Sequence, residues 1–491
     1  MHIKRSLCLL LSIAQLLLIF SITGCVDKKN TDPSTTSVTA AARQPVGFGA
    51  SVQVLPDPAV QARLDAMYAA AAQTSGADAA EELQAWLAYG NWNSPITADD
   101  LCDAVQAVVC GCDGSAPIAC ADVLAAADVA ADPGDGVTFS DTSQILSYLL
   151  GGYMGQVVSM NTDALITLAP GCDLAASVPG DGSYMSAVAL SQLLGYGFLR
   201  AADVPDDSAA DVSGSALCGM LVSICGRLGA GAPAAFDPAA ADSFLSQFGG
   251  VSVSYINLFT GEFYSYDGGD TGYYAASTIK APFAWYICSQ IVSGQADPDS
   301  TIQYTRAYSQ YTDSEIESEK IPYGTELTLA QLLHFMIVYS DNVALYMLAS
   351  EFDVDGFDAF LAAQGIDTST IYGINTSYES SDFCAQVMRK IYGFLTRNSA
   401  DQYAQAFEDD LKHTDVNYFS LSEPVIGKYG WWLQNLHQIG IVCDASPYVL
   451  TVMTSDGGNG TDSTRGAGVI ARIAAYFDAQ NKARYDVMIT G

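Results

Sequence analysis

The sequence predicts a multidomain protein with a C-terminal α+β domain, an antiparallel sheet flanked by helices, and a mainly α-helical, Ala-rich N-terminal domain. Its 491 residues suffice for two or three domains of about 150 residues each. Residues 46–240 contain three arginines and no lysine, and apolar residues recur there at helical spacing. Residues 246–491 begin and end with alternating segments around turns and carry helical segments between them, which favours a sheet covered by helices.

The first 25 residues read as a targeting segment. Lys4 and Arg5 precede a nearly continuous apolar run over 7–20, and Gly24-Cys25 follows. This pattern resembles a bacterial lipoprotein signal peptide, in which cleavage before Cys25 leaves a lipidated N-terminus. The alternative is an uncleaved membrane anchor, and both interpretations export the protein. We therefore expect a chain that is lipid-anchored to the cell membrane on its extracellular or periplasmic side.

Residues 26–45, rich in Thr, Ser, Ala and Lys, predict a flexible tether. The 20 Lys and Arg residues against 54 Asp and Glu give a net charge of −34, which disfavours nucleic acid as a partner. The sequence leaves the oligomeric state open. After loss of the signal and lipidation of Cys25, ten of the 12 cysteines remain, and disulfides among them are plausible in an exported protein. A Cys110-x-Cys112 zinc site is a weaker alternative, and nothing implies a metal or another cofactor.

Two segments of the N-terminal domain look like copies of one unit. Thr97 lies five residues before Cys102, as Ser213 lies five residues before Cys218, and an apolar helix follows each hydroxyl residue. Residues 184–194 offer a related third piece. The pattern weakly resembles the start of the helix in S-layer homology modules, without the basic residue of those motifs. An Ala-rich helical bundle with accidental similarity is the alternative.

The C-terminal domain, 246–491, opens with a hairpin around Thr260-Gly261 and closes with a second hairpin followed by an amphipathic helix. Apolar helices separate the two hairpins. The expected elements, in order, are strands 251–257 and 262–267, helices 279–291 and 329–349, strands 431–436, 437–443 and 448–454, and helix 465–479.

Ser277-Thr278-Ile279-Lys280 at the start of a helix is the first candidate for chemistry. Residues i and i+3 share a helix face, so the serine hydroxyl and the lysine amine can meet. A serine needs a base to attack a carbonyl, and a lysine desolvated beside other cations can be neutral enough to serve. Such a tetrad alone also describes a solvated helix start, but this is the only Ser-x-x-Lys in the chain.

Ser340-Asp341-Asn342 interrupts the apolar helical segment and is the second candidate. A polar triplet in an apolar run has partly buried side chains and therefore needs partners. Ser340 could pass a proton between Lys280 and a leaving group, and the amide of Asn342 could hold a substrate amide. Taken alone, the triplet is equally a helix break with local hydrogen bonds.

Lys428-Tyr429-Gly430, before the expected strand at 431–436, is the third candidate. The lysine could attract a substrate carboxylate, and the glycine would let substrate approach the strand edge. The three motifs in this order, each in the expected local context, are much stronger together than any one of them.

Together these motifs resemble the class A β-lactamase and penicillin-binding serine hydrolase family, marked by Ser-x-x-Lys, Ser-Asp-Asn and Lys-Thr-Gly. The resemblance covers 246–491, and it implies no cofactor. A β-lactam or a peptidoglycan stem peptide would be the substrate. The roles it implies are an acylated nucleophile at Ser277, its base at Lys280, a second wall from Ser340 and Asn342, a carboxylate site at Lys428 beside Gly430, and an oxyanion hole from the backbone N–H groups of Ser277 and Trp431.

The sequence departs from the family pattern in two ways. Tyr429 replaces the small hydroxyl residue of the third motif. Class A enzymes also carry, between the second and third motifs, a Glu with Leu-Asn three positions later, which activates the water that removes the acyl group. The glutamates in that interval, none with that sequel, are Glu351, Glu379, Glu408 and Glu423. Acylation could therefore proceed while hydrolysis is slow.

Three functions remain open. The first is an exported serine hydrolase of class A type that forms an acyl-enzyme with a β-lactam or a cell-wall peptide. β-Lactam hydrolysis and antibiotic resistance would follow only if this acyl-enzyme is also hydrolysed. A penicillin-binding D-Ala-D-Ala carboxypeptidase or transpeptidase-like enzyme is the second. The third is a surface-binding protein whose hydrolase domain has lost catalysis. The intact serines, lysine and asparagine of the first two motifs favour an enzyme.

Overall fold

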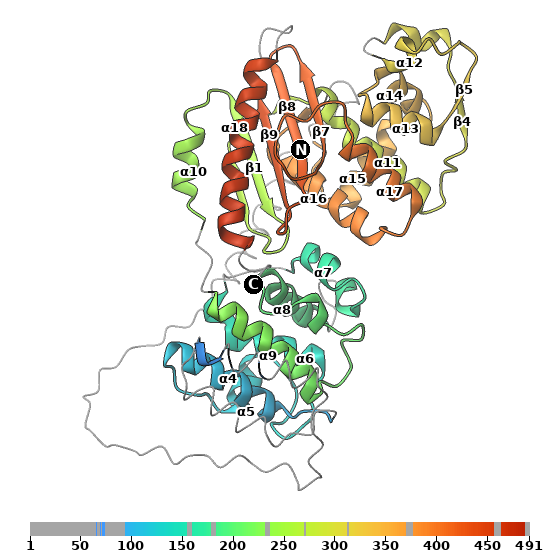
Figure 1. Cartoon of the computed structure of the whole chain (residues 1–491). Coiled ribbons are helices and arrows are strands. Elements are labelled where there is room, and N and C mark those ends of the chain that lie inside the picture. Colours follow the sequence, from blue (N-terminus) through green and yellow to red (C-terminus); the bar gives the residue numbers. More distant parts are fainter. Residues whose placement is uncertain are drawn as a thin grey trace, which may run out of the picture. The chain divides into compact units, whose positions relative to one another are not determined.

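The computed structural model describes most of the chain from residue 94 onward (Figure 1). The described residues are 65, 69, 71–73, 94–154, 160–177, 183–230, 236–269, 272–311, 314–369, 377–455 and 463–486. The predicted signal and tether lie outside them, so lipidation at Cys25 stays a prediction. Within the described ranges, no helix is both long and apolar enough to cross a membrane.

The N-terminal region is helical, as predicted. Its helices between residues 94 and 230 are α4 (Ala98–Asp113), α5 (Cys120–Ala126), α6 (Phe139–Leu150), η1 (Gly151–Tyr153), α7 (Thr162–Leu168), η2 (Asp173–Ala176), α8 (Tyr184–Gly195), η3 (Ala201–Asp203) and α9 (Gly214–Gly229). They enclose one apolar core that includes buried Cys102, Cys120 and Cys218. The ten cysteines in the described part of the chain are free thiols, so these three pack as small apolar side chains.

Three helices of this region share one kind of start. In each of them the side-chain hydroxyl of the N-cap residue accepts a hydrogen bond from a backbone N–H of the first turn. These N-cap residues are Thr97 for α4, Thr138 for α6 and Ser213 for α9. Isolated β-bridges join the three starts to one another, Pro95 to Ser213, Thr97 to Gly136 and Thr138 to Asp211. The third unit is therefore α6. The expectation of a third piece at 184–194 was wrong: α8 covers it, but its N-cap, Ser183, makes no side-chain capping bond.

The C-terminal domain is built on a five-stranded antiparallel sheet in the order β2-β1-β9-β8-β7. The strands are β1 (Val251–Asn257), β2 (Phe263–Tyr266), β7 (Val425–Trp432), β8 (Asn435–Val442) and β9 (Tyr448–Thr454), with two short pairs, β3 (Tyr273–Tyr274) with β6 (Tyr378–Glu379) and β4 (Thr301–Gln303) with β5 (Glu326–Thr328). The predicted α+β architecture, an antiparallel sheet flanked by helices, is confirmed.

Helices cover both faces of the sheet (Figure 1). On one face, Tyr255 and Leu450 pack with Phe477 of α18, and on the other, Ile439 and Val449 join the core of α11 and α16. This alternation follows from the two-residue period of a strand. The helical elements are α10 (Pro238–Leu245), η4 (Ala276–Ile279), α11 (Lys280–Val292), η5 (Arg306–Gln310), α12 (Glu315–Ser318), α13 (Leu329–Val338), α14 (Asn342–Ala349), α15 (Val354–Ala363), α16 (Ser381–Arg397), α17 (Gln402–Lys412), α18 (Thr464–Asn481) and η6 (Lys482–Asp486).

The expected strand at 431–436 was wrong. Strand β7 runs through the Lys428 motif to Trp432, and β8 begins at Asn435, so a hairpin turn lies inside the expected strand. The turn places Leu433 at φ 54°, a conformation that Gly or Asn usually supplies. The residues at this point, Trp431-Trp432-Leu433, include neither Gly nor Asn, so the sequence did not indicate the turn. As a result, the third motif lies within an edge strand and not before one.

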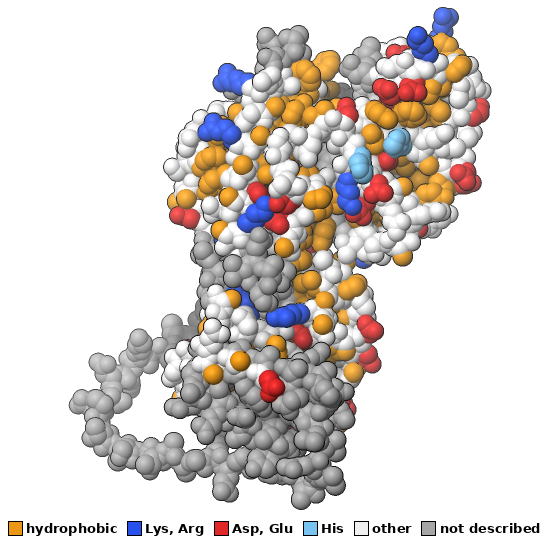
Figure 2. Space-filling view, in the orientation of Figure 1, with side chains coloured by type: hydrophobic (Ala, Val, Ile, Leu, Met, Phe, Trp, Pro, Cys, Tyr) orange, Lys and Arg blue, Asp and Glu red, His pale blue; other side chains and the backbone are white. Residues whose placement is uncertain are grey.

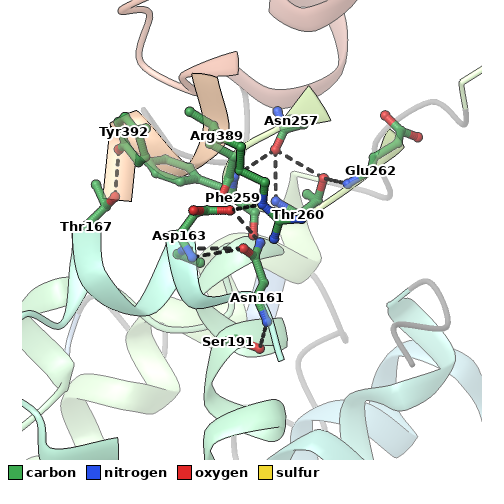
Figure 3. A network of polar contacts seen from close by, with 12 residues as sticks. Asn161, Asp163, Thr167, Ser191, Asn257, Phe259, Thr260, Glu262, Arg389 and Tyr392 are labelled. Carbon is green, nitrogen blue, oxygen red and sulfur yellow. Dashed lines mark hydrogen bonds and ion pairs between the residues drawn. The ribbon is translucent and has the colours of Figure 1, made fainter. Parts of the chain in front are cut away.

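A polar network joins the helical region to the C-terminal domain (Figure 3). Asn161 caps α7 by accepting the backbone N–H groups of Asp163 and Ala164, and its side-chain amide donates to the backbone oxygens of Leu258 and Phe259 in the β1–β2 turn. A Cβ at Gly195 would collide with that same Phe259 oxygen, so a glycine at the end of α8 permits this close approach.

Helix α16 supplies the other side of this network (Figure 3). Arg389 Nε lies 2.5 Å from Asp163 Oδ2, and the Tyr392 hydroxyl lies 2.6 Å from Thr167 Oγ1. Asp163 is buried, and burial raises the pKa of its carboxyl although Arg389 acts against that shift. The ion pair therefore compensates a desolvated carboxylate, and the loss of one partner costs more than the loss of both.

Arg389→Met is expected to lower the free energy of unfolding by about 2 kcal/mol, because Asp163 would stay buried without its cation. Chemical denaturation at pH 7 measures this. The double variant Asp163→Asn, Arg389→Met is expected to recover part of the loss. A double variant as unstable as the sum of both single variants would show that the two side chains do not interact.

The surface carries few basic side chains, and several are neutralised by acids. On the face drawn in Figure 2, lysine and arginine side chains are few and scattered, some directly beside acidic ones. Ion pairs of partly exposed lysines among the described residues include Lys482 with Glu423 and Asp478, and Lys412 with Glu408. This face therefore offers no continuous basic patch among the residues that the structure describes.

Candidate active site

The nucleophile candidate lies on a tight turn. Ser277 belongs to the short 3-10 helix η4, and α11 begins three residues later at Lys280. Ala276, directly before the serine, has φ 50°, a left-handed conformation that costs a non-glycine residue about 1–2 kcal/mol. Strained backbone of this kind persists where the surroundings impose it, and it is common at active sites.

The amine of Lys280 is the centre of the site. It is 1% exposed, and its Nζ lies 3.1 Å from Ser277 Oγ, 3.3 Å from Ser340 Oγ, 2.5 Å from the Ser340 backbone oxygen and 2.8 Å from Asn342 Oδ1. The last two oxygens are acceptors only, so they take two hydrogens of the amine. A neutral amine then has its lone pair left for a serine hydroxyl, which is the arrangement that a base requires.

The second motif lies at the break between α13 and α14. Ser340 has φ 57°, which turns its backbone oxygen and its hydroxyl toward Lys280. Asp341 is buried and anchors the break: one carboxylate oxygen accepts from the Ala344 N–H, and the other accepts from Ser314 Oγ and the Ile316 N–H. Asp341 was absent from the predicted site residues, although its N-cap position before α14 was a usable signal.

The third motif lies on edge strand β7. Lys428 is fully buried, and its Nζ has no hydrogen-bond partner within the described ranges. Burial, and repulsion from Lys280 whenever that amine is protonated, hold the pKa of Lys428 well below its usual range, and Asp415 opposes this only in part. A buried amine of this kind needs an anion, so a substrate carboxylate would supply its missing partner.

Gly430 lets β7 lie directly against the nucleophile turn. A Cβ there would come within 2.7 Å of the Ala275 oxygen and 3.1 Å of the Ser277 nitrogen. The backbone of β7 next to Trp431 is therefore close to the backbone N–H of Ser277. This closeness is what an oxyanion hole built from the Ser277 and Trp431 N–H groups requires.

Tyr429 changes the family pattern in a defined way. Its ring centroid lies 4.1 Å from Lys428 Nζ, and its hydroxyl bonds to Asp415 Oδ2 at 3.4 Å. Burial and Asp415 raise the pKa of Tyr429, while a hydrogen bond with Ser340 acts to lower it. The phenol therefore keeps its proton, and its hydroxyl lies next to Ser340 of the second motif.

Two buried polar side chains behind the turn were not among the predicted site residues. His437 on β8 bonds through Nε2 to the Tyr274 oxygen at 3.0 Å and accepts the Thr454 N–H at Nδ1. Burial lowers its pKa to about 4, so it is a neutral packing histidine. Glu379 on β6 bonds to Thr278 Oγ1 at 2.5 Å. Its sequence position gave no sign of this contact.

The described side chains of the site do not form a set of metal ligands. Among the residues that the structure describes, no three His, Cys, Asp or Glu side chains gather in a way that could hold a metal ion. The groups around Lys280 are two hydroxyls, one amide oxygen and one backbone oxygen, which suit proton transfer at a carbonyl.

Residues 239–477 match the family model described as the Beta-lactamase enzyme family. The C-terminal domain is β-lactamase-like. Similar solved structures include a β-lactamase from Sphaerobacter thermophilus DSM 20745 (21% identity, 50% of this chain and 97% of that one, TM-score 0.43) and one from Chitinophaga pinensis DSM 2588 (22%, 50% and 98%, 0.43). PBP-A, solved as a mutant acyl-enzyme complex with penicillin G, is 17% identical over 50% of this chain and 96% of its own, with a TM-score of 0.44. No curated protein matched.

The glutamates between the second and third motifs of this β-lactamase-like domain have other tasks. Glu408 pairs with Lys412, and Glu423 pairs with Lys482. Glu351 follows α14 on the surface, and Glu379 bonds to Thr278 and Cys384. Whether one of these glutamates activates a hydrolytic water stays a prediction of the sequence.

Proposed function

We propose that the C-terminal domain is a serine hydrolase that forms an acyl-enzyme at Ser277 with β-lactams and with cell-wall peptides that end in a carboxylate. The observation that carries the proposal is the cluster around Lys280 Nζ, which brings Ser277, Ser340 and Asn342 from two distant segments within 3.3 Å of one amine. A lysine with a purely structural role would need neither the Ser277 nor the Ser340 hydroxyl. A general base needs the Ser277 hydroxyl as the nucleophile and the Ser340 hydroxyl as a route for the proton.

In the proposed reaction, Ser277 Oγ attacks the substrate carbonyl carbon while its proton moves to Lys280 Nζ. The oxyanion is held by the backbone N–H groups of Ser277 and Trp431, and the substrate carboxylate by Lys428. The carbon–nitrogen bond then breaks, and the proton passes from Lys280 through Ser340 Oγ, 3.3 Å away, to the leaving nitrogen. An ester at Ser277 and a free amine result.

The acyl-enzyme is expected to persist, because none of the glutamates between the second and third motifs has the sequence context of a deacylating base. This favours a penicillin-binding carboxypeptidase or transpeptidase-like activity over rapid β-lactam hydrolysis. Export and a lipid at Cys25 remain part of the proposal, since they would place the domain beside peptidoglycan.

A fluorescent penicillin is expected to label the purified protein covalently, because Ser277 is the group that it acylates. In-gel fluorescence after denaturation measures this. Ser277→Ala is expected to abolish the label, whereas Ser293→Ala, at an exposed position after α11, should leave it unchanged. If neither β-lactams nor acyl esters label the wild type, the domain is a binding protein and not an enzyme.

A further inference from the structure

Glu379 is a fully buried acid directly behind the nucleophile turn. It lies on β6 opposite Tyr273, and its Oε2 is 2.5 Å from Thr278 Oγ1 and 3.3 Å from Cys384 Sγ. Its other oxygen, Oε1, has no hydrogen-bond partner among the described residues. Thr278 follows Ser277 directly, so this carboxyl touches the element that carries the nucleophile.

A count of hydrogens fixes the protonation state that suits these contacts. The Thr278 hydroxyl lies 2.6 Å from the Ala275 oxygen and 2.5 Å from Glu379 Oε2, but it has one hydrogen. A backbone oxygen cannot donate, so the bond to Ala275 uses that hydrogen. The contact with Glu379 is then a hydrogen bond only if the carboxyl is protonated and donates to Thr278.

We propose that Glu379 is a positioning residue: its neutral carboxyl donates to Thr278, which in turn donates to Ala275, and this relay holds the turn that presents Ser277. The catalytic consequence rests on the function proposed above. When Glu379 ionises, its carboxylate takes the Thr278 hydrogen, and the Ala275 oxygen loses a hydrogen bond. Ala275 and Thr278 bracket the left-handed Ala276 and the nucleophile, so their hydrogen bond closes the turn.

The surroundings of Glu379 favour its neutral form. Thr278 of η4 and Cys384 of α16 bond to its carboxyl, Tyr273 of β3 is its cross-strand partner, and the described residues give it no ion pair. Burial raises the pKa of Glu379 to about 7, although the bonds to Thr278 and Cys384 lower it. Burial also raises the pKa of the Cys384 thiol and raises that of Tyr273 to about 12, so both neighbours stay uncharged near neutral pH.

Glu379→Gln tests the proposal, because an amide donates to Thr278 as a neutral carboxyl does but cannot ionise. The acylation rate constant with the fluorescent penicillin is measured for both proteins from pH 5 to 9. The acylation rate constant of the wild type, divided by that of Glu379→Gln, is expected to fall about two- to tenfold as the pH rises through 7. A change of this size corresponds to the loss of one hydrogen bond. The half-saturating penicillin concentration should change little. A ratio that is constant over this range would overturn the proposal.

Thermal unfolding of the same two proteins gives a readout that needs no activity. The folded-state pKa of Glu379 lies above its ordinary value of 4.5, so the folded protein binds the extra proton between about pH 4.5 and 7. The melting temperature of the wild type is therefore expected to fall relative to Glu379→Gln across that window and to level off above it. A difference independent of pH would contradict a neutral Glu379.

Variants of Thr278 test the middle of the relay. Thr278→Val removes the hydroxyl and is expected to slow acylation and to remove its dependence on Glu379, whereas Thr278→Ser keeps the hydroxyl and should retain both. Equal pH profiles for the Val and Ser variants would overturn the relay. If no acyl donor labels even the wild type, the function proposed for Ser277 fails, and the pH dependence of unfolding still decides the state of Glu379.

Discussion

Replacing Lys280 with methionine is expected to slow acylation of Ser277 about 10³-fold, because general bases typically contribute 10²- to 10⁴-fold. Among the described residues, the amine is the group hydrogen-bonded to Ser277 Oγ, at 3.1 Å, that can accept its proton. Methionine keeps the length and the apolar stem of the side chain in a buried position. The rate constant of labelling at saturating fluorescent penicillin, measured at pH 7, reports the change.

Lys320→Met is the matched control, since this lysine is exposed and lies outside the site. It should label at the wild-type rate. Circular dichroism and thermal unfolding of Lys280→Met separate a lost base from a lost fold. A correctly folded Lys280→Met protein that acylates within threefold of the wild type would show that another group activates Ser277.

Replacing Lys428 with methionine is expected to raise stability and to weaken the reaction. The buried Nζ has no hydrogen-bond partner among the described residues, so its removal should increase the free energy of unfolding by about 1–3 kcal/mol. Because the folded-state pKa of Lys428 is lowered, the unfolded chain binds a proton that the folded chain gives up. The gain in free energy of unfolding should therefore be largest at neutral and acidic pH, and it should vanish as the pH approaches about 10.4, the pKa of lysine in the unfolded chain.

The same variant is expected to acylate about tenfold to a hundredfold more slowly with penicillins, whose carboxylate would lose its partner. An acyl ester without a carboxylate is the matched control and should react at nearly the wild-type rate. Denaturation and labelling of one preparation measure both effects. A variant that is less stable than the wild type, or equally slow with both donors, would contradict the role given to Lys428.

The sequence predicted the fold of the C-terminal half because its signals are local. Alternation on both sides of Thr260-Gly261 determined the first hairpin, and the spacing of Ser277 and Lys280 placed both on one turn. The hairpin turn at Leu433 was missed because no glycine or asparagine marks a left-handed position there. The residues around Leu433 therefore give no turn signal, and the turn is defined only by the pairing of β7 with β8.

Contacts between distant segments could not be predicted in this way. Glu379 reaches Thr278 because β6 pairs with β3, a pairing of two residues on each side that leaves no periodic pattern. Asp415 affects Lys428 and Tyr429 from outside every recognised motif. In the N-terminal region, α6 was missed as the third capped unit because no cysteine follows Thr138 at the spacing that marked the other two.

Mass spectrometry of the intact protein after exposure to penicillin G, followed by peptide mapping, tests the central claim most directly. One adduct per chain, with the mass of the whole penicillin, is expected on the peptide that contains Ser277, and it should persist for longer than a rapid turnover would allow. An adduct on any other residue, or an unmodified wild-type protein under conditions where it remains folded, would contradict the assignment of Ser277 as a nucleophile activated by Lys280.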